Sequence, residues 1–172
     1  MNIDYKSIIR NAILLFVLIF VQKSLVWFIS LSQLNLSPDL VIIALIYIGV
    51  REGKISGAVY GFVAGLLLDV LSGSFLGLLA LSYTVSAFIA GFFQTENDRF
   101  LVRFNFIIAV FAISILSNFI YFGLFFQGTP ILFAKVMLLY IFPSSTYTTI
   151  ISLVYTILPK KKGYDRSYLS ES

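Results

Sequence analysis

The chain has 172 residues, of which 59% are hydrophobic and 12% are charged, and its mean hydropathy is +0.98. A soluble domain carries about 25% charged residues, so this composition excludes a soluble globular protein and predicts one compact membrane domain. The chain has no cysteine and no histidine. Their absence removes disulfides, thiol nucleophiles, histidine acid–base catalysis and the usual zinc sites.

Six apolar runs follow one another along the chain, and we expect each to form a transmembrane helix of an all-α, polytopic bundle. The second run opens with Ser37, Pro38 and Asp39, which suit an N-cap, a first helical position and the positive end of a helix dipole. The single predicted domain covers residues 1–160, and the short basic tail, 161–172, is expected to be disordered. The predicted spans are 11–31, 38–50, 55–71, 75–93, 101–126 and 131–158.

The second and third runs are short for a membrane crossing. We expect them to lie in a locally thinned bilayer or inside the bundle. If the two runs formed a re-entrant hairpin instead, Arg51, Glu52 and Lys54 would lie at the membrane centre. Burying three charges there is costly, which favours two crossings joined by a turn in water.

The positions of the basic residues predict how the bundle lies in the membrane. With six crossings, ten of the twelve Lys and Arg residues fall on one side, and the loops of the other side have none. The positive-inside rule therefore places both termini in the cytoplasm. The same distribution favours a topological role for the charge over nucleic-acid binding, although the pI is about 9.3. The alternative for the basic residues 160–162 is a contact with anionic membrane lipid, which we expect as a partner. The ten residues are Lys6, Arg10, Arg51, Lys54, Arg99, Arg103, Lys160, Lys161, Lys162 and Arg166.

Glycines recur every four residues in the third run, at Gly57, Gly61 and Gly65. In a bilayer this spacing makes a smooth groove that allows another helix to approach closely. Two interpretations stay open: the groove packs against a helix inside the bundle, or it receives the helix of a partner protein. Gly77, which follows the break in the apolar run at residues 72–74, is a fourth candidate for helix contact.

Four charged residues fall in the outer part of the predicted membrane domain: Lys23, Asp39, Asp69 and Lys135. Charges are rare in such segments unless they have partners. We hypothesise that the four residues form an outer polar cluster in which at least one aspartate pairs with a lysine. In the alternative, Asp39 caps its helix, Asp69 reaches the adjacent turn and water, and both lysines extend toward the membrane surface.

Pro143 interrupts the sixth run and is followed by three hydroxyl residues. A proline frees a backbone carbonyl, which neighbouring hydroxyls can satisfy, so a kink is the simplest expectation. A broken helix that lines a substrate cavity is the alternative, because transporters use such breaks.

Catalytic motifs find no support in the sequence. It has no paired carboxylates at a useful spacing, no Walker-type phosphate loop, no serine elbow and no cluster of metal ligands. We therefore expect a protein that is not an enzyme and that needs no cofactor.

The stretch from Ser37 to Gly91 resembles MreD, the family of rod shape-determining membrane proteins of bacteria. This stretch is about a third of the chain, and the chain length, the six helices, the short outer loops and the basic tail agree with the family over the rest. The residues that carry the resemblance are, in order, Pro38-Asp39-Leu40, Arg51-Glu52-Gly53, the glycines 57, 61 and 65, Leu66 to Ser74, and Leu76-Gly77.

The resemblance implies a non-enzymatic scaffold of the bacterial inner membrane, in the Rod machinery that builds lateral peptidoglycan and elongates the cell. It implies direct binding to MreC and, through the complex, an association with RodA and a class B penicillin-binding protein, with the MreB filament on the cytoplasmic side. It also implies a fold similar to the substrate-binding subunits of energy-coupling-factor transporters. The alternative function is therefore a substrate-binding subunit of a vitamin transporter, although the predicted outer loops are short for a lid.

Overall fold

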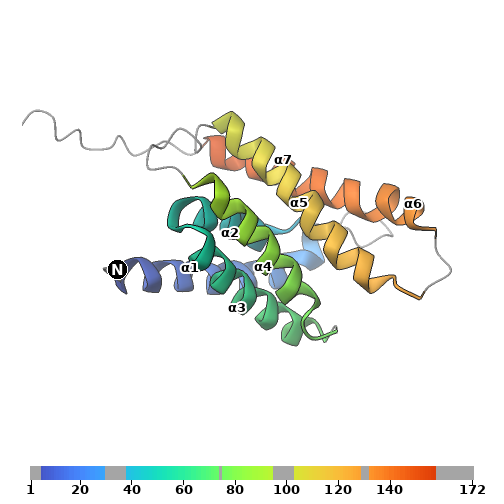
Figure 1. Ribbon diagram of the computed structural model, residues 1–172, viewed down its shortest axis with the longest axis horizontal. Helices are drawn as coiled ribbons and strands as arrows, with labels where there is room; N and C mark the ends of the chain where they lie inside the picture. Colours follow the sequence, from blue (N-terminus) through green and yellow to red (C-terminus); the bar gives the residue numbers. More distant parts are fainter. Residues whose placement is uncertain (1–4, 30–37, 74, 95–102, 129–131, 158–172) are drawn as a thin grey trace, which may run out of the picture.

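The structure is a computed structural model that describes residues 5–29, 38–73, 75–94, 103–128 and 132–157 (Figure 1). Within these ranges every regular element is a helix, as the composition predicted. Four helices among the described residues are long and apolar enough to cross a membrane. They lie in α1, in α3, in α5 and in the continuous helical rod that α6 and α7 form together. The helices are α1 (Tyr5–Ile29), α2 (Leu40–Glu52), α3 (Lys54–Ser72), α4 (Leu78–Ala90), α5 (Arg103–Phe125), α6 (Phe133–Val136) and α7 (Phe142–Ile157).

The helices form two groups. α5 and the rod made by α6 and α7 lie side by side, and α1 to α4 pack together on the other side of the molecule (Figure 1). α4 and α2 contact α5 and so join the two groups. A 3-10 turn, Gly91–Phe93, extends α4, and a π-helical segment, Met137–Ile141, joins α6 to α7.

α2 lies in the centre of the bundle. Its 13 residues rise only about 20 Å, which is less than the ~30 Å hydrocarbon core of a bilayer. A helix that is apolar on all sides is stable when protein surrounds it. This short run was expected either to lie in a locally thinned bilayer or to lie inside the bundle, and the structure shows it inside the bundle. Its side chains with at most 1% exposure are Val41, Ile42, Leu45, Ile46 and Ile48.

The boundaries of the helices differ from the predicted ones where polar side chains find partners. α1 begins at Tyr5 rather than at residue 11, because Ser7 Oγ donates to Glu52 Oε1 at 2.5 Å and Asn11 Nδ2 donates to the same oxygen. Asp39, not Ser37, is the N-cap of α2. Ser37, the tail 161–172 and the predicted span ends at residues 31, 101, 131 and 158 lie outside the described residues.

α3 and α4 share the most extensive contact of the bundle. Side chains on the α3 glycines would overlap the α4 backbone, so α4 fills the groove that the glycine spacing predicted. The contact is therefore internal packing, and α4 occupies the face that a partner helix would need. A Cβ at Gly57, Gly61 and Gly65 would lie, respectively, 2.7 Å from Ala87 O, 2.5 Å from Tyr83 O and 2.5 Å from Ala80 Cα.

Gly77 does not take part in this helix contact. It precedes α4 with a φ of +99°, and a Cβ on it would meet nothing within 4 Å. A left-handed φ favours glycine, so this residue shapes the turn between α3 and α4. The expectation that Gly77 is a site of close helix approach is thus corrected to a role in the turn.

Pro143 lies in the first turn of α7, directly after the π-helical segment. A proline lacks an N–H group and crowds the carbonyl four residues before it, and the wider π turn relieves that crowding. Helical structure continues across the site, so the predicted break is a local change in winding. Thr146 Oγ1 donates to the Phe142 carbonyl at 2.8 Å. This carbonyl is not the one that Pro143 leaves without an N–H donor, which lies four residues before the proline, so the hydroxyl compensation expected from the sequence stays a prediction.

The helices run alternately between two ends of the bundle. At the Glu52 end, the start of α1 contacts the end of α2 through Ser7, and the turn after α4 contacts the start of α3. At the Asp39 end, Lys23 of α1 donates to Ser72 of α3 at 2.5 Å, and the end of α5 contacts the turn between α3 and α4. The two ends therefore carry different polar contacts.

We expect Gly61→Ala to destabilise the protein, because the new methyl group would overlap the Tyr83 carbonyl. Overpacking of this kind costs about 1–3 kcal/mol, which a lower Tm in mild detergent would reveal. Gly123→Ala is the matched control, since a Cβ there would meet its nearest atom, in the Phe133 ring, at 3.9 Å. The control should keep or raise the Tm, because alanine favours helix over glycine. Equal Tm values for the two variants would contradict the close contact.

Candidate functional site

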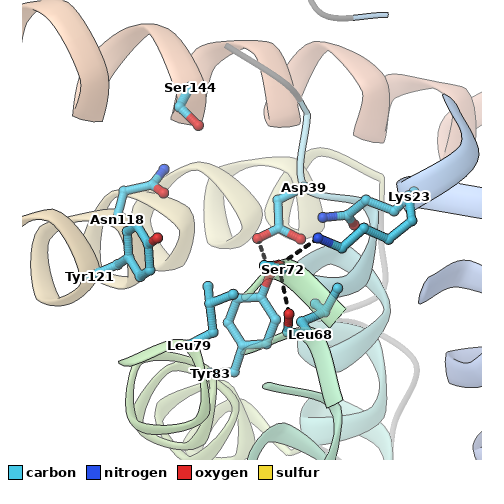
Figure 2. Close-up of a pocket in the computed structure, with 10 residues that line it drawn as sticks. Lys23, Asp39, Leu68, Ser72, Leu79, Tyr83, Asn118, Tyr121 and Ser144 are labelled. Carbon is cyan, nitrogen blue, oxygen red and sulfur yellow. Dashed lines mark hydrogen bonds between the residues drawn. The ribbon is translucent and has the colours of Figure 1, made fainter. Parts of the chain in front are cut away.

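A polar pocket of about 380 Å³ opens at the Asp39 end, between the α5–α7 group and α1 to α4 (Figure 2). Eight of the ten residues around it carry polar side chains, and they come from both groups of helices. Its volume lies in the range of small-molecule sites, about 300–1,000 Å³. The lining residues are Gln22, Lys23, Asp39, Leu68, Ser72, Leu79, Tyr83, Asn118, Tyr121 and Ser144.

Asp39 connects three helices at this pocket. Its Oδ1 accepts a hydrogen bond from the Ile42 backbone N–H at 3.0 Å, which caps α2. Its Oδ2 accepts from the Tyr83 hydroxyl of α4, and its own backbone N–H donates to Thr148 Oγ1 of α7 at 3.0 Å. The contacts with the helix N-terminus and the hydroxyl stabilise the carboxylate and hold α2, α4 and α7 together.

Lys23 lines the pocket from α1, on the same side as Asp39 (Figure 2). Its ammonium donates to Ser72 Oγ at 2.5 Å, and that hydroxyl donates to the Leu68 carbonyl at 2.6 Å. One turn of α3 therefore positions the partner of the lysine. Also on α1, Gln22 Oε1 accepts from the Val41 backbone N–H at 3.0 Å, which ties α1 to the start of α2.

Asp69 is fully buried beneath the pocket, at 0% exposure. Its carboxylate accepts hydrogen bonds from the backbone N–H groups of Gly77 at 2.9 Å, Leu79 at 3.2 Å and Ala80 at 3.2 Å. A carboxylate at the first N–H groups of a helix satisfies donors that have no partner within the helix and complements its dipole. Asp69 of α3 thus caps α4 and fixes the turn between the two helices.

The four predicted charged residues do not gather into one cluster. Lys23 and Asp39 line the pocket, and Asp69 lies beneath it. Lys135 is exposed on α6 and is not part of the pocket lining. Within the described residues Lys23 donates to a serine rather than to a carboxylate. The geometry around the two aspartates matches the alternative, in which Asp39 caps its helix and Asp69 reaches the adjacent turn.

Sequence reasoning did not identify several uncharged residues of the pocket. Tyr83, which is 1% exposed, provides the hydroxyl for Asp39. Asn118 Nδ2 donates to Ser145 Oγ at 2.9 Å and joins α5 to α7. The only sign of these residues in the sequence is that they are polar and lie inside apolar runs. The sequence does not show which of them face one another.

The pocket suits the binding of a polar group. It offers one ammonium, one carboxylate, two amides and several hydroxyls, which together donate and accept hydrogen bonds. Both oxygens of Asp39 accept hydrogen bonds from the protein, so the side chain is held in place. Within the described part of the chain, no group of three or more metal-ligating side chains comes together.

Comparison with known families identifies the chain over nearly its whole length. The family model described as rod shape-determining protein MreD matches residues 6–159, which include every residue that lines the polar pocket. No curated protein and no solved structure gives a significant match.

We expect Asp69→Asn to lower the stability of the protein measurably. Asparagine has one acceptor oxygen where the carboxylate has two, so at least one N–H at the start of α4 would lose its partner. An unsatisfied buried donor costs about 1–3 kcal/mol, and thermal unfolding in mild detergent would show the loss as a lower Tm. A Tm equal to that of the wild type would contradict the capping role of Asp69.

Proposed function

The chain belongs to the MreD family of rod shape-determining proteins, and we propose that it is a non-enzymatic scaffold that binds MreC. The match over residues 6–159 carries this proposal, because it supports a role in rod shape determination. The chain is an integral membrane protein with long apolar helices. Most of its described mass lies in those helices, which suits a partner that is itself anchored in the membrane.

We further propose that six helical segments, namely α1 to α5 and the rod of α6 and α7, cross the bacterial inner membrane with both termini in the cytoplasm. The alternation of helix direction between the two ends supports this topology. Arg10, Arg51 and Lys54 belong to the Glu52 end, whereas Lys23 belongs to the Asp39 end. The positive-inside rule then places the Glu52 end in the cytoplasm and the polar pocket on the outer side.

The proposed surface for MreC is an apolar groove of about 490 Å³ between α1, α2 and α7. It extends along α2 from Leu40, at the Asp39 end, to Tyr47, whose hydroxyl accepts from Arg51 at 2.5 Å. A single membrane helix can pack into such a groove, since close contact and shape carry helix association in lipid. The groove residues are Leu14, Leu18, Leu40, Ile43, Ala44, Tyr47, Phe106, Ile151, Ser152 and Val154.

The other proposed partners follow from MreC binding. RodA and a class B penicillin-binding protein would be reached through the complex, and the MreB filament would lie near the Glu52 end. The scaffold would hold these proteins together in the plane of the membrane while lateral peptidoglycan is made.

A second candidate function is a substrate-binding subunit of an energy-coupling-factor vitamin transporter. The polar pocket favours it, because its volume of about 380 Å³ and its mixed donors and acceptors suit a small ligand. A vitamin or a pair of ATPases that co-purified with the chain, in place of MreC, would support this function over the scaffold.

We expect the chain to restore rod shape in a rod-shaped bacterium that has been depleted of its own MreD and has become spherical. Val154→Trp, which fills the groove at a residue with 55% exposure, should fail to restore shape and should co-purify with less MreC. Ile108→Trp is the matched control, since Ile108 is 52% exposed on α5 outside the groove. Normal membrane levels of both variants must be verified by immunoblotting. Equal MreC recovery with both variants would contradict this docking surface.

A further inference from the structure

A second apolar groove, of about 280 Å³, lies between α1 and α3. Leu15, Ile19 and Ala64 form its floor, with at most 5% exposure. Phe16 and Val63 belong to its walls and are 57% and 50% exposed. The groove is therefore open to its surroundings along a narrow apolar strip.

This groove and the polar pocket follow one another along α1 and α3, toward the Asp39 end. Lys23 follows Ile19 by one turn of α1, and Ser72 follows Leu68 by one turn of α3. The hydrogen bond between Lys23 and Ser72, 2.5 Å long, thus lies where the apolar groove ends and the polar pocket begins. An apolar track about 10 Å long, by the rise of α1 from Ala12 to Ile19, thus ends about one helical turn from a site with opposite charges.

We propose that this track binds one phospholipid whose headgroup carries a primary ammonium. The acyl chain lies in the α1–α3 groove, the phosphate binds Lys23, and the headgroup ammonium binds Asp39. The proposal requires only that the chain is embedded in a membrane, so it can fail or hold independently of MreC binding.

The charges of the pocket favour this headgroup. An ammonium has three N–H donors, and Lys23 uses one of them for Ser72, which leaves two for phosphate oxygens. The Asp39 carboxylate accepts hydrogen bonds from the Ile42 backbone and the Tyr83 hydroxyl, and the Gln22 side chain and Val41 backbone also interact with it, so its partners in the protein are neutral groups. An ammonium would add the positive charge that these neutral partners do not supply, whereas a headgroup that ends in hydroxyls would leave the negative charge of Asp39 without a counter-charge.

The groove between α1 and α3 would bind the acyl chain of the lipid. Its lining is apolar apart from the Tyr60 hydroxyl, and every methylene group that leaves contact with other lipids gains packing against its floor. A free headgroup has no acyl chain and cannot use this contact. The track should therefore bind the intact lipid more tightly than the headgroup alone.

Native mass spectrometry of the full chain in mild detergent tests the proposal. The wild type would be titrated with phosphatidylethanolamine and with phosphatidylglycerol that have the same acyl chains. We expect one phosphatidylethanolamine to bind about tenfold or more tightly than phosphatidylglycerol, since the ammonium gains a charged hydrogen bond. O-phosphoethanolamine at the same concentration should not displace the lipid. Equal affinity for the two lipids, or displacement by the free headgroup, would overturn the proposal.

Two surface variants separate the charge from the groove. Lys23→Met should weaken phosphatidylethanolamine binding about tenfold or more, and Val63→Trp should weaken it by blocking the groove. The matched controls are Lys135→Met and Val70→Trp, which change an exposed lysine on α6 and a residue with 62% exposure on α3 outside the groove. Binding by the two test variants at wild-type strength, or an equal loss in the controls, would overturn the proposal.

Discussion

The contact between α3 and α4 is the constraint on which the rest of the structure depends. Three glycines spaced by four residues allow the backbones to meet, and any side chain at these positions would overlap α4. In lipid the hydrophobic effect does not drive helices together, so packing and hydrogen bonds must do so. The contact brings α4 back along α3 and directs the start of α4 toward Asp69, whose carboxylate then satisfies three backbone N–H groups. A buried acid and a glycine stripe are thus parts of one hairpin.

The same hairpin gives the two ends of the bundle different chemistry. It places Tyr83 where its hydroxyl reaches Asp39, and it places Ser72 where Lys23 can bind it. A polar pocket results at one end, while the other end is joined by Ser7, Asn11 and Glu52. α2 is enclosed between these contacts. Because protein surrounds it, its length need not match the thickness of the bilayer. With the glycine face filled by α4, the grooves along α1 are open apolar surfaces of the described helices.

The sequence predicted the class, the helix content and the family, because composition and long apolar runs depend on local information. It also predicted that the glycines mark close packing and that Asp39 lies at a helix start. It did not predict that α4 fills the glycine groove, since spacing does not identify the neighbouring helix. The pairing of Lys23 with Ser72, and of Asp69 with the start of α4, depends on how the turn at Gly73 and Gly77 folds. Tyr83 and Asn118 were missed because their partners lie on other helices.

The orientation of the bundle connects this structure to its proposed function, and cysteine accessibility measures it directly, because the chain has no native cysteine. Gln127 is exposed after the end of α5, at the Asp39 end, and Ile55 is 79% exposed at the start of α3, at the Glu52 end. We expect a membrane-impermeant thiol reagent to label Gln127→Cys in intact cells and to label Ile55→Cys only after the membrane is opened. Labelling of both from the same side, or the reverse pattern, would contradict a six-crossing bundle whose polar pocket faces outward.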